Sequence, residues 1–361
     1  MKSLALKTII VLILTVLLSQ SAFATRYHVK DTGGSDNNNG LSWDYAFKTI
    51  QKGIDTASSG DDIWVMGYYD STAYDITVAI DVNKAVNLYG GFHMGEDEPA
   101  DRDSDQVSII DADNNCRCFN VTADATIDGF ELLDGNAENG GGMYVYDCAP
   151  KIVGCAFISN YASADGGGIY AEDIFEGTME VINCLFYYNF AYHYGGGMYN
   201  VYAEPEIVNC TFYQNTGYEN GGAICNDSDN STMINCILWY NSSEEGVGKE
   251  IFNYDSGSMY VSYSCIYGGL NGDYCDGDST DDGDNTGNSP SFRSGDVNGN
   301  DNRYLSGDDG LVPTGSSIVD RGDNSAISET FDIVPLHLRK VDGDGTPGAV
   351  VDMGCYENQD D

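Results

Sequence analysis

The sequence predicts an all-β protein: a single-stranded, right-handed parallel β-helix with an N-terminal capping helix and a loop-rich C-terminal tail. Three observations predict it. A segment of about 26 residues recurs along the chain, its apolar residues alternate with a period of two, and no copy shows a helical period. Because a repeat made only of strands and turns cannot bury its own apolar face, the copies must stack into a solenoid.

Residues 1–24 have the composition of a secretory signal peptide. Lys2 and Lys7 give a basic start, an apolar run follows from Ile9 to Leu18, and Ala22-Phe-Ala24 supplies a small-x-small cleavage site. No later apolar stretch approaches the roughly 20 residues that a transmembrane helix needs. We therefore expect an exported protein with no transmembrane segment in its mature chain.

Residues 44–57 are predicted to form a helix that closes the first coil, because an open solenoid end exposes strand edges and apolar interior. Ser42 is a suitable N-cap residue for this helix. Its apolar residues fall at helical spacing: Ala46, Phe47, Ile50, Ile54 and Ala57. Together with this cap, we expect the β-helix to occupy residues 25–270.

The coils carry two repeated motifs. The first aligns without gaps in four copies: Ile152-Val-Gly-Cys-Ala-Phe-Ile-Ser-Asn160, Val181-Ile-Asn-Cys-Leu-Phe-Tyr-Tyr-Asn189, Ile207-Val-Asn-Cys-Thr-Phe-Tyr-Gln-Asn215 and Met233-Ile-Asn-Cys-Ile-Leu-Trp-Tyr-Asn241. The second is a glycine turn, as in Gly166-Gly-Gly-Ile-Tyr170. A leucine-rich repeat has a similar period, but residues 138–269 contain only two leucines and no helical half-repeat.

Stacking places identical residues above one another in columns. We expect the Asn column (Asn160, Asn189, Asn215, Asn241) to form a buried amide ladder at a turn. The Cys column, from Cys155 to Cys236 and on to Cys265, is interpreted as small buried hydrophobes. Eleven cysteines are an odd number, so at least one thiol stays free or pairs between chains; Cys265 and Cys275 are candidates for a loop disulfide.

The charge of the chain restricts its partners. With 57 acidic and 16 basic residues, the formal net charge is -41. A nucleic-acid binder needs a basic surface that displaces counterions, so nucleic acid is excluded as a partner. The same charge disfavours unaided binding to anionic lipid or polyuronate.

One aromatic column is predicted to point outward from the coils: Tyr187, Tyr213 and Trp239, with Tyr188 and Tyr240 beside it. Exposed aromatic rings can stack on sugar rings or on a partner protein. We therefore expect an extracellular glycan or a surface protein as the partner of this column. In the alternative interpretation, the C-terminal tail packs over it.

Residues 271–361 are rich in Asp, Gly and Asn, and we expect this region to pack on the last coils because its apolar islands are too small for a core. Its oxygen-bearing side chains favour a weak Ca²⁺ site, because Ca²⁺ takes several oxygen ligands. The candidate ligands are Asp276, Asp278, Asp282, Asp296, Asn298 and Asn300. Gly307 stands where an EF-hand has its bidentate Glu, so we expect a looser site; the alternative is a solvated acidic loop.

Several segments resemble a known family. Leu41-Ser-Trp-Asp-Tyr-Ala-Phe47, Leu88-Tyr-Gly-Gly-Phe92, the repeated coils and Asp352-Met-Gly-Cys-Tyr-Glu357 look like exported parallel β-helix proteins of bacteria, which have a pectin-lyase-like fold. These are related to polymorphic outer membrane proteins, and the tail resembles the choice-of-anchor Q region. The resemblance covers nearly all of residues 26–357. It implies a secreted or cell-surface location, in the bacterial outer membrane or outside the cell.

The resemblance says less about activity, because the family mixes adhesins, surface proteins and pectin-lyase-like proteins. A lyase needs a cationic base and charge neutralisation, yet residues 119–292 hold two basic residues, Lys151 and Lys249, against 26 acidic ones. The galacturonan hydrolase motifs are absent from these coils. The sequence thus favours an adhesin-like or structural surface module that contacts glycans. The alternative is a polysaccharide lyase or glycoside hydrolase that uses Asp residues near coil turns as acid and base. The candidates are Asp128, Asp134, Asp147 and Asp165, whose spacing picks out no pair.

Overall fold

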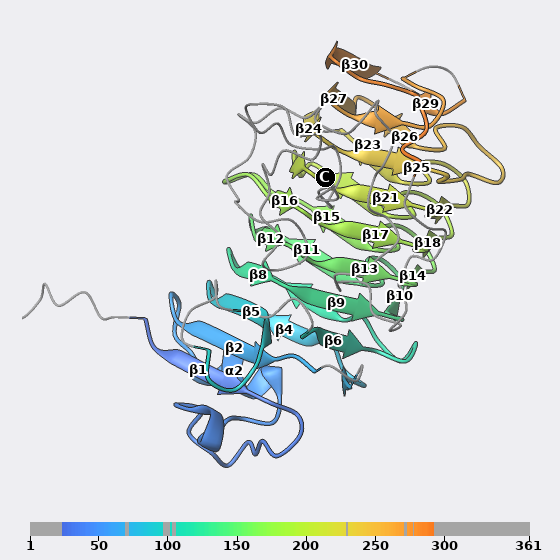
Figure 1. Cartoon of the computed structure of the whole chain (residues 1–361). Helices are drawn as coiled ribbons and strands as arrows, with labels where there is room; N and C mark the ends of the chain where they lie inside the picture. Colours follow the sequence, from blue (N-terminus) through green and yellow to red (C-terminus); the bar gives the residue numbers. More distant parts are fainter. Residues whose placement is uncertain are drawn as a thin grey trace, which may run out of the picture.

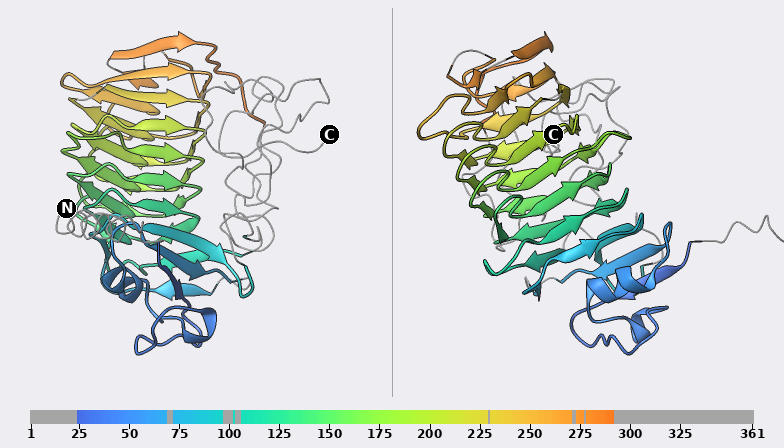
Figure 2. Two further views of the ribbon diagram at one scale, coloured as in Figure 1. Left: turned by 90° about the vertical axis from the view of Figure 1, so that its left-hand side faces the viewer. Right: turned by 180° about the vertical axis from the view of Figure 1, so that it is seen from behind.

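Stacked parallel coils make up most of the chain, from the N-terminal end in blue to the last coils in orange (Figures 1 and 2). The computed structural model describes residues 24–68, 72–96, 102, 106–228, 230–270, 273–276 and 278–291. Successive strands of each sheet come from successive coils and run parallel. The parallel β-helix predicted from the repeat is therefore confirmed.

Three long sheets and one short sheet form the walls of the solenoid. Sheet A contains β1 (Arg26–Val29), β2 (Asp62–Met66), β5 (Asn87–Phe92), β8 (Thr126–Asp128), β12 (Lys151–Val153), β16 (Glu180–Ile182), β20 (Glu206–Val208), β24 (Asn230–Ile234), β27 (Ser258–Ser262) and β30 (Asp278–Gly283). Sheet B contains β3 (Ala73–Asp75), β6 (Ser108–Asp111), β9 (Phe130–Leu133), β13 (Ala156–Ile158), β17 (Leu185–Tyr187), β21 (Thr211–Tyr213), β25 (Ile237–Trp239) and β28 (Cys265–Ile266).

Sheet C contains β4 (Ile80–Val82), β7 (Phe119–Val121), β11 (Met143–Tyr146), β15 (Ile169–Glu172), β19 (Met198–Val201), β23 (Ile224–Asp227), β26 (Ile251–Tyr254) and β29 (Cys275–Asp276). The short sheet D contains β10 (Asn136–Ala137), β14 (Tyr161–Ala162), β18 (Phe190–Ala191) and β22 (Thr216–Gly217). A full coil passes through A, B, D and C in that order. The glycine turn lies between D and C, where Gly166 and Gly195 both have φ of +65°.

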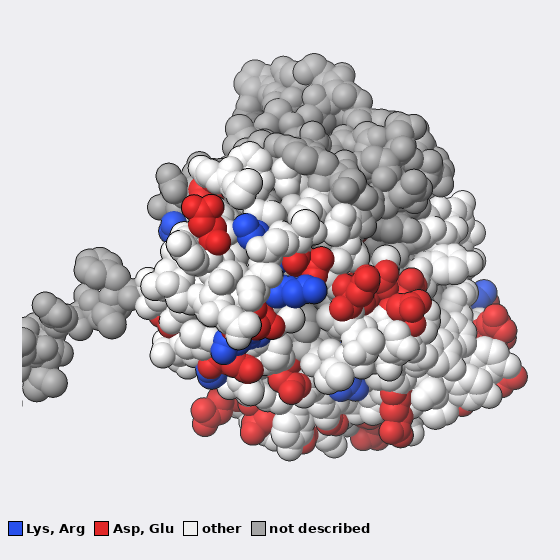
Figure 3. Space-filling view, turned by 90° about the horizontal axis from the view of Figure 1, so that it is seen from below, with Lys and Arg blue, Asp and Glu red and all other residues white. Residues whose placement is uncertain are grey.

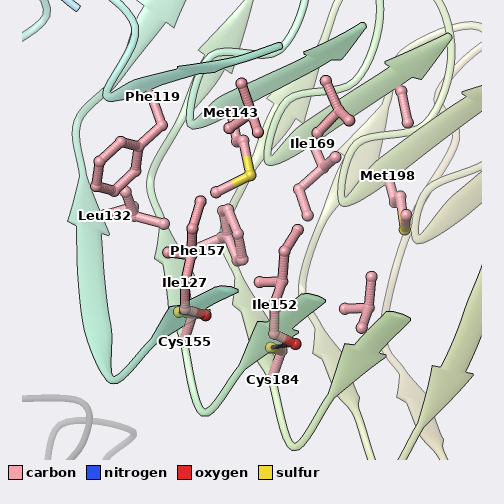
Figure 4. Packing of buried hydrophobic residues seen from close by; sticks show 14 of the residues in the cluster. Phe119, Ile127, Leu132, Met143, Ile152, Cys155, Phe157, Ile169, Cys184 and Met198 are labelled. Atoms are coloured by element: carbon pink, nitrogen blue, oxygen red, sulfur yellow. Dashed lines mark hydrogen bonds between the residues drawn. The ribbon is translucent and has the colours of Figure 1, made fainter. Parts of the chain in front are cut away.

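Alternate residues of each strand fill one continuous core. In sheet B the rings of Phe157, Phe186 and Phe212 stack face to face, with centroids 4.8 and 4.3 Å apart. Figure 4 shows Phe157 of sheet B together with Ile152 of sheet A and Ile169 of sheet C, all pointing into the interior. Burial of these repeated columns is what holds one coil to the next.

The asparagine ladder is confirmed at the turn after sheet B. Asn160, Asn189, Asn215 and Asn241 are buried, and the Nδ2 of each of the first three donates to the Oδ1 of the next at 2.9 Å. Each Nδ2 also donates to a backbone carbonyl of the preceding coil. The ladder thus satisfies backbone groups that the turn would otherwise leave unpaired in the interior.

The cysteines of the repeat are structural. The thiols of Cys155, Cys184, Cys210 and Cys236 are fully buried and donate to backbone carbonyls at 3.3–3.7 Å. Burial raises the pKa of Cys155 and Cys210 well above the ordinary thiol value, so these thiols stay protonated and unreactive.

The predicted Cys column is wrong at its last member, Cys265, which pairs in register with Ile237. Ser264 takes the column position next to Cys236 in the following coil, and its Oγ accepts from the Cys236 backbone N–H. The last coil is offset by one residue, which turns Cys265 to the outer face of sheet B. Cys265 and Cys275 lie in different sheets and both thiols are free, so the predicted loop disulfide is absent.

The N-terminal cap is present but shorter than the predicted helix over 44–57. A 3₁₀ turn covers Trp43–Tyr45, and α2 covers Ile50–Thr56, capped by the Thr49 side chain rather than by Ser42. Phe47 instead adopts extended backbone and exchanges hydrogen bonds with His28 and Lys30 of the first strand region. All five predicted apolar residues are nevertheless buried.

The solenoid also continues beyond residue 270, where we expected it to end, because β29 pairs with β26 and β30 pairs with β27. Residues 292–361, the rest of the predicted tail, lie outside the described residues, as does the predicted signal peptide up to residue 23. In the part of the chain that the structure describes, no helix is long and apolar enough to cross a membrane.

Candidate functional site

The outward aromatic column predicted from the sequence lies on sheet B. Tyr187 of β17, Tyr213 of β21 and Trp239 of β25 are direct register partners in adjacent strands. Phe186, Phe212 and Leu238, which precede them, point into the core, so alternation turns the three aromatic residues outward. The Tyr187 and Tyr213 ring centroids are 6.0 Å apart.

Only part of this column can meet a ligand. Tyr187 and Tyr213 are half-buried, whereas Trp239 is only 5% exposed. Tyr267 and Tyr240 pack against the indole at centroid distances of 4.8 and 5.8 Å. Trp239 is therefore a buried support for the surface, which corrects the expectation that it contacts a ligand directly.

Two tyrosines at the corner next to this column are well exposed. Tyr188 and Tyr240 expose 62% and 52% of their surface. Each precedes a buried Asn of the ladder and has φ of +59°, in the left-handed region. This conformation is uncommon for a bulky residue and costs on the order of 1 kcal/mol. Gln214 occupies the same corner of the intervening coil with φ of +55°.

We call Tyr187, Tyr188, Tyr213, Tyr240 and Tyr267 the aromatic rim. Three neighbouring pairs of the rim are tilted by 50–58°, namely Tyr187 against Tyr188, Tyr213 against Tyr240, and Tyr240 against Tyr267, whereas Tyr187 and Tyr213 lie within 15° of parallel. The core phenylalanines, by contrast, stack within 3° of parallel and cover one another's faces. Within the rim, Tyr188 and Tyr240 have the largest exposed surface, and an exposed ring face is what a stacking ligand requires.

The rim carries hydroxyl groups and no carboxylate of its own. Burial raises the pKa of Tyr213, and the nearby Tyr274 raises that of Tyr267. Both phenols are therefore neutral at physiological pH, able to donate and accept hydrogen bonds. An apolar face bordered by neutral hydroxyls suits a neutral polyhydroxylated ligand better than an ion.

A second aromatic column, on sheet C, escaped the sequence analysis. Tyr144, Tyr170 and Tyr199 are register partners, and consecutive centroids lie 5.5 Å apart. The Tyr170 hydroxyl donates to Glu172 at 3.0 Å, and the Tyr199 hydroxyl donates to Asp227 at 3.1 Å. The repeated Tyr after each glycine turn was its signal in the sequence.

This sheet C column is a packing feature. Tyr170 and Tyr199 are 8% and 6% exposed, so their faces are covered by neighbouring rings. Where Cys225 interrupts the column, Tyr194 lies between Tyr199 and Phe252, at centroid distances of 6.0 and 6.2 Å. The column stabilises the outer wall of sheet C and offers little surface to a ligand.

Burial raises the pKa of Asp134, and Asp165 is a second turn aspartate of the enzyme alternative with a raised pKa. Burial raises its pKa, and its Oδ1 lies 3.9 Å from His193 Nδ1. The same Oδ1 accepts from the Tyr194 backbone N–H at 3.0 Å, which fixes the turn between coils. Fixing this turn is a structural role that accounts for the buried carboxyl.

The predicted calcium ligands do not converge within the described residues. Asp276 lies in β29 of sheet C, whereas Asp278 and Asp282 lie in β30 of sheet A. Asp296, Asn298 and Asn300 lie outside the described residues. Across the described ranges, no group of three or more His, Cys, Asp or Glu could hold a metal ion. The calcium site stays a prediction.

The described basic residues gather near the capped end, where Figure 3 shows Lys and Arg beside Asp and Glu. One of these pairs is bidentate: Arg102 donates to both carboxylate oxygens of Asp128 at 3.0 Å. Beyond residue 119 the described coils hold only Lys151 and Lys249. The aromatic rim therefore lies in the strongly acidic part of the molecule.

These features define a parallel β-helix repeat protein with an exposed aromatic rim. Two segments, residues 154–172 and 209–227, match the model of the Chlamydia polymorphic membrane protein repeat. Each runs from the corner before sheet B, through the Asn ladder and the glycine turn, to the end of a sheet C strand. These two segments are thus similar to polymorphic membrane protein repeats, which agrees with the resemblance seen in the sequence.

Two further comparisons were made. No curated protein matches the chain. Among solved structures, a rhamnogalacturonan lyase is similar, with 13% sequence identity, a TM-score of 0.40, and 68% of each chain covered. This level of similarity carries no information about the activity of the present chain.

Proposed function

We propose that this protein is an adhesin-like β-helix of the bacterial cell surface that binds a neutral glycan through the aromatic rim. The polymorphic membrane protein repeats and the signal-like residues 1–24 support a location at the outer membrane or outside the cell. The observation that carries the binding role is the exposure of Tyr188 and Tyr240 at this corner. Every coil has a left-handed residue here, as Ser159 and Gln214 show, so the support comes from a bulky exposed aromatic side chain at a position that suits a smaller residue better.

The choice of a neutral glycan follows from the chemistry of the rim. Tilted aromatic rings can stack against the C–H face of a sugar, and the neutral phenols can bond to its hydroxyls. A net charge of -41 would repel uronates and other polyanions. A surface protein is the other partner class, and the experiment below separates the two.

The test screens the full-length protein on an array of neutral and acidic glycans and then measures affinity by calorimetry. Tyr188→Asn and Tyr240→Asn should each weaken binding about tenfold, the effect of losing one well-placed aromatic contact. Because Asn tolerates left-handed backbone, both variants should melt no lower than the wild type. Gln214→Asn, at the same corner, is the matched control and should bind normally.

Retention of no neutral glycan, or equal affinity in the Tyr188→Asn, Tyr240→Asn double variant, would contradict the proposal. Reducing ends or unsaturated products appearing during the same incubation would instead support the second candidate, a lyase or hydrolase of neutral or uronate glycans. In that case Asp134→Asn or Asp165→Asn should abolish product formation, since both are partly buried turn aspartates of raised pKa.

A further inference from the structure

The outer face of sheet B is buried although its residues point away from the core. One column of register partners is only 0–1% exposed throughout: Glu131, Ala156, Leu185, Thr211, Ile237 and Cys265. These residues alternate with the core column of Phe157, Phe186 and Phe212, so they lie on the opposite side of the strands.

Sheet A provides the comparison. Its equivalent outward column contains Lys151, Glu180, Glu206, Thr232 and Tyr260, and none of these five is buried. Tyr260, for example, is 43% exposed. On sheet A this first outward column is open to solvent, and the second outward column is buried at Ile182 and Val208, which are 5% and 2% exposed. The column on sheet B is buried at every position from Glu131 to Cys265. Something covers sheet B.

At one end of the column, Ile237 and Cys265 pack with Trp239, Tyr213 and Tyr267. The described secondary structure does not cover the remainder. Within the described ranges, the principal backbone neighbours of β13, β17 and β21 are strands of their own sheet. The sequence of the column also fits a hidden surface, because Ala156, Leu185 and Ile237 are apolar. Leaving such a stripe in water would be unfavourable by roughly 25 cal/mol per Å².

The described chain leaves the solenoid on this same face. Thr286 forms a bridge with Cys265, and the Cys265 thiol donates to the Asn288 carbonyl at 3.1 Å. Cys265 is the last member of the buried column, and Pro290 is already buried. The 70 residues from 292 to 361 therefore start at the edge of the covered face.

We propose that residues 292–361 dock along the outer face of sheet B and form an intramolecular cover over the Leu185 column. The segment contains apolar residues that can supply this contact, among them Phe331, Ile333, Val334, Leu336 and Leu338. The cover ends short of the corner, where Tyr188 and Tyr240 stay exposed. Because Tyr187 and Tyr213 lie on the same face as Leu185 and Thr211, the cover borders the rim, and ligand contact at the corner rests on Tyr188 and Tyr240.

The first test uses trypsin on the full-length protein. Residues 292–361 contain five tryptic sites, at Arg293, Arg303, Arg321, Arg339 and Lys340, whereas residues 119–291 contain two. Thr211→Glu places a carboxylate in the covered column and should release the segment, so that cleavage within it becomes at least about tenfold faster. Thr232→Glu, outward on sheet A in the next coil, is the matched control and should cleave at the wild-type rate.

Equal cleavage rates in the Thr211→Glu, Thr232→Glu and wild-type proteins would overturn the proposal. A second measurement does not depend on a destabilising change. The photo-reactive residue p-benzoylphenylalanine replaces Tyr213 on the covered sheet or Tyr260 on the open sheet of the full-length chain. Irradiation should join position 213, but not position 260, to a peptide from residues 292–361 of the same chain. Crosslinks from position 213 only to a second copy, or only to other regions, would overturn the proposal.

Discussion

Glu250 is a buried acid at the end of the asparagine ladder. Its Oε2 accepts from Asn241 Nδ2 at 2.6 Å, while its Oε1 is buried without a hydrogen-bond partner. Burial raises its pKa from an ordinary value of 4.5 to about 8. The folded protein therefore holds a proton on Glu250 at neutral pH, a state that the apolar surroundings favour over the carboxylate.

Glu250→Gln should stabilise the protein at neutral and alkaline pH. Between pH 4.5 and 8 the unfolded chain loses the Glu250 proton while the folded chain keeps it, so wild-type stability falls as the pH rises. The neutral amide removes this penalty, which is on the order of 3–5 kcal/mol at pH 8 and above. Denaturant unfolding at pH 5 and pH 8 measures it.

The exposed Glu206→Gln is the control for this series and should leave the pH dependence of stability unchanged. A difference between Glu250→Gln and the wild type that is the same at both pH values would show that Glu250 ionises normally in the folded protein.

At the scale of the elements, the asparagine ladder does more than fill space. The Asn215 side chain donates to Phe186 O and Asn241 Oδ1, and its own Oδ1 accepts from the Asn189 side chain and backbone N–H. The Asn215 side-chain amide thus makes four hydrogen bonds, which join its coil to the two neighbouring coils. A polar network that is fully satisfied fixes register in a way that apolar contacts cannot.

Asn215→Ala should destabilise the folded protein by about 3–5 kcal/mol, because it leaves several buried donors and acceptors unpaired. Thermal and urea unfolding would measure the loss. Asn230→Ala, an exposed asparagine that contacts Glu204 at 3.4 Å, should change stability by about 0.5 kcal/mol or less. A similar, small effect at both positions would mean that the ladder contributes no more than a surface contact.

The elements also show what the sequence could predict. Strands, glycine turns and the ladder were predictable because every coil repeats them, so each copy confirms the others. The start of α2 was not predictable from the sequence, because whether Phe47 joins a helix or pairs with the first strand depends on its hydrogen bond to residue 28. The same limit applies to Cys265, since a one-residue offset in the last coil turns a side chain from the interior to the outside.

The aromatic rim was predictable only in part. Alternation correctly turned Tyr187, Tyr213 and Trp239 outward, but exposure depends on neighbours that a strand pattern does not contain. Tyr267, which covers Trp239, belongs to a loop of a later coil. The exposed Tyr188 and Tyr240 break the alternation, because the left-handed corner before the ladder turns two consecutive residues outward.

At the scale of the whole molecule, the acidic charge is the dominant unexplained property. Clustered carboxylates repel one another unless cations neutralise them. If residues 276–300 hold Ca²⁺ with an affinity on the order of 0.1–1 mM, millimolar Ca²⁺ should raise the melting temperature of the full-length protein above its value in chelator. Matched Mg²⁺ and ionic strength are the controls. An unchanged melting temperature would leave the acidic segments as solubilising charge.

The stacked phenylalanines have a consequence for how such a molecule changes in evolution. Phe157, Phe186 and Phe212 stack ring on ring, and the Asn column beside them repeats one type of hydrogen bond from coil to coil. A coil would therefore make the same types of interior contact with a duplicate of itself as with its present neighbour. Duplication or loss of a whole coil would leave every interior contact type intact, so the distance between the capped end and the aromatic rim can lengthen or shorten in fixed increments of one strand spacing, about 4.8 Å.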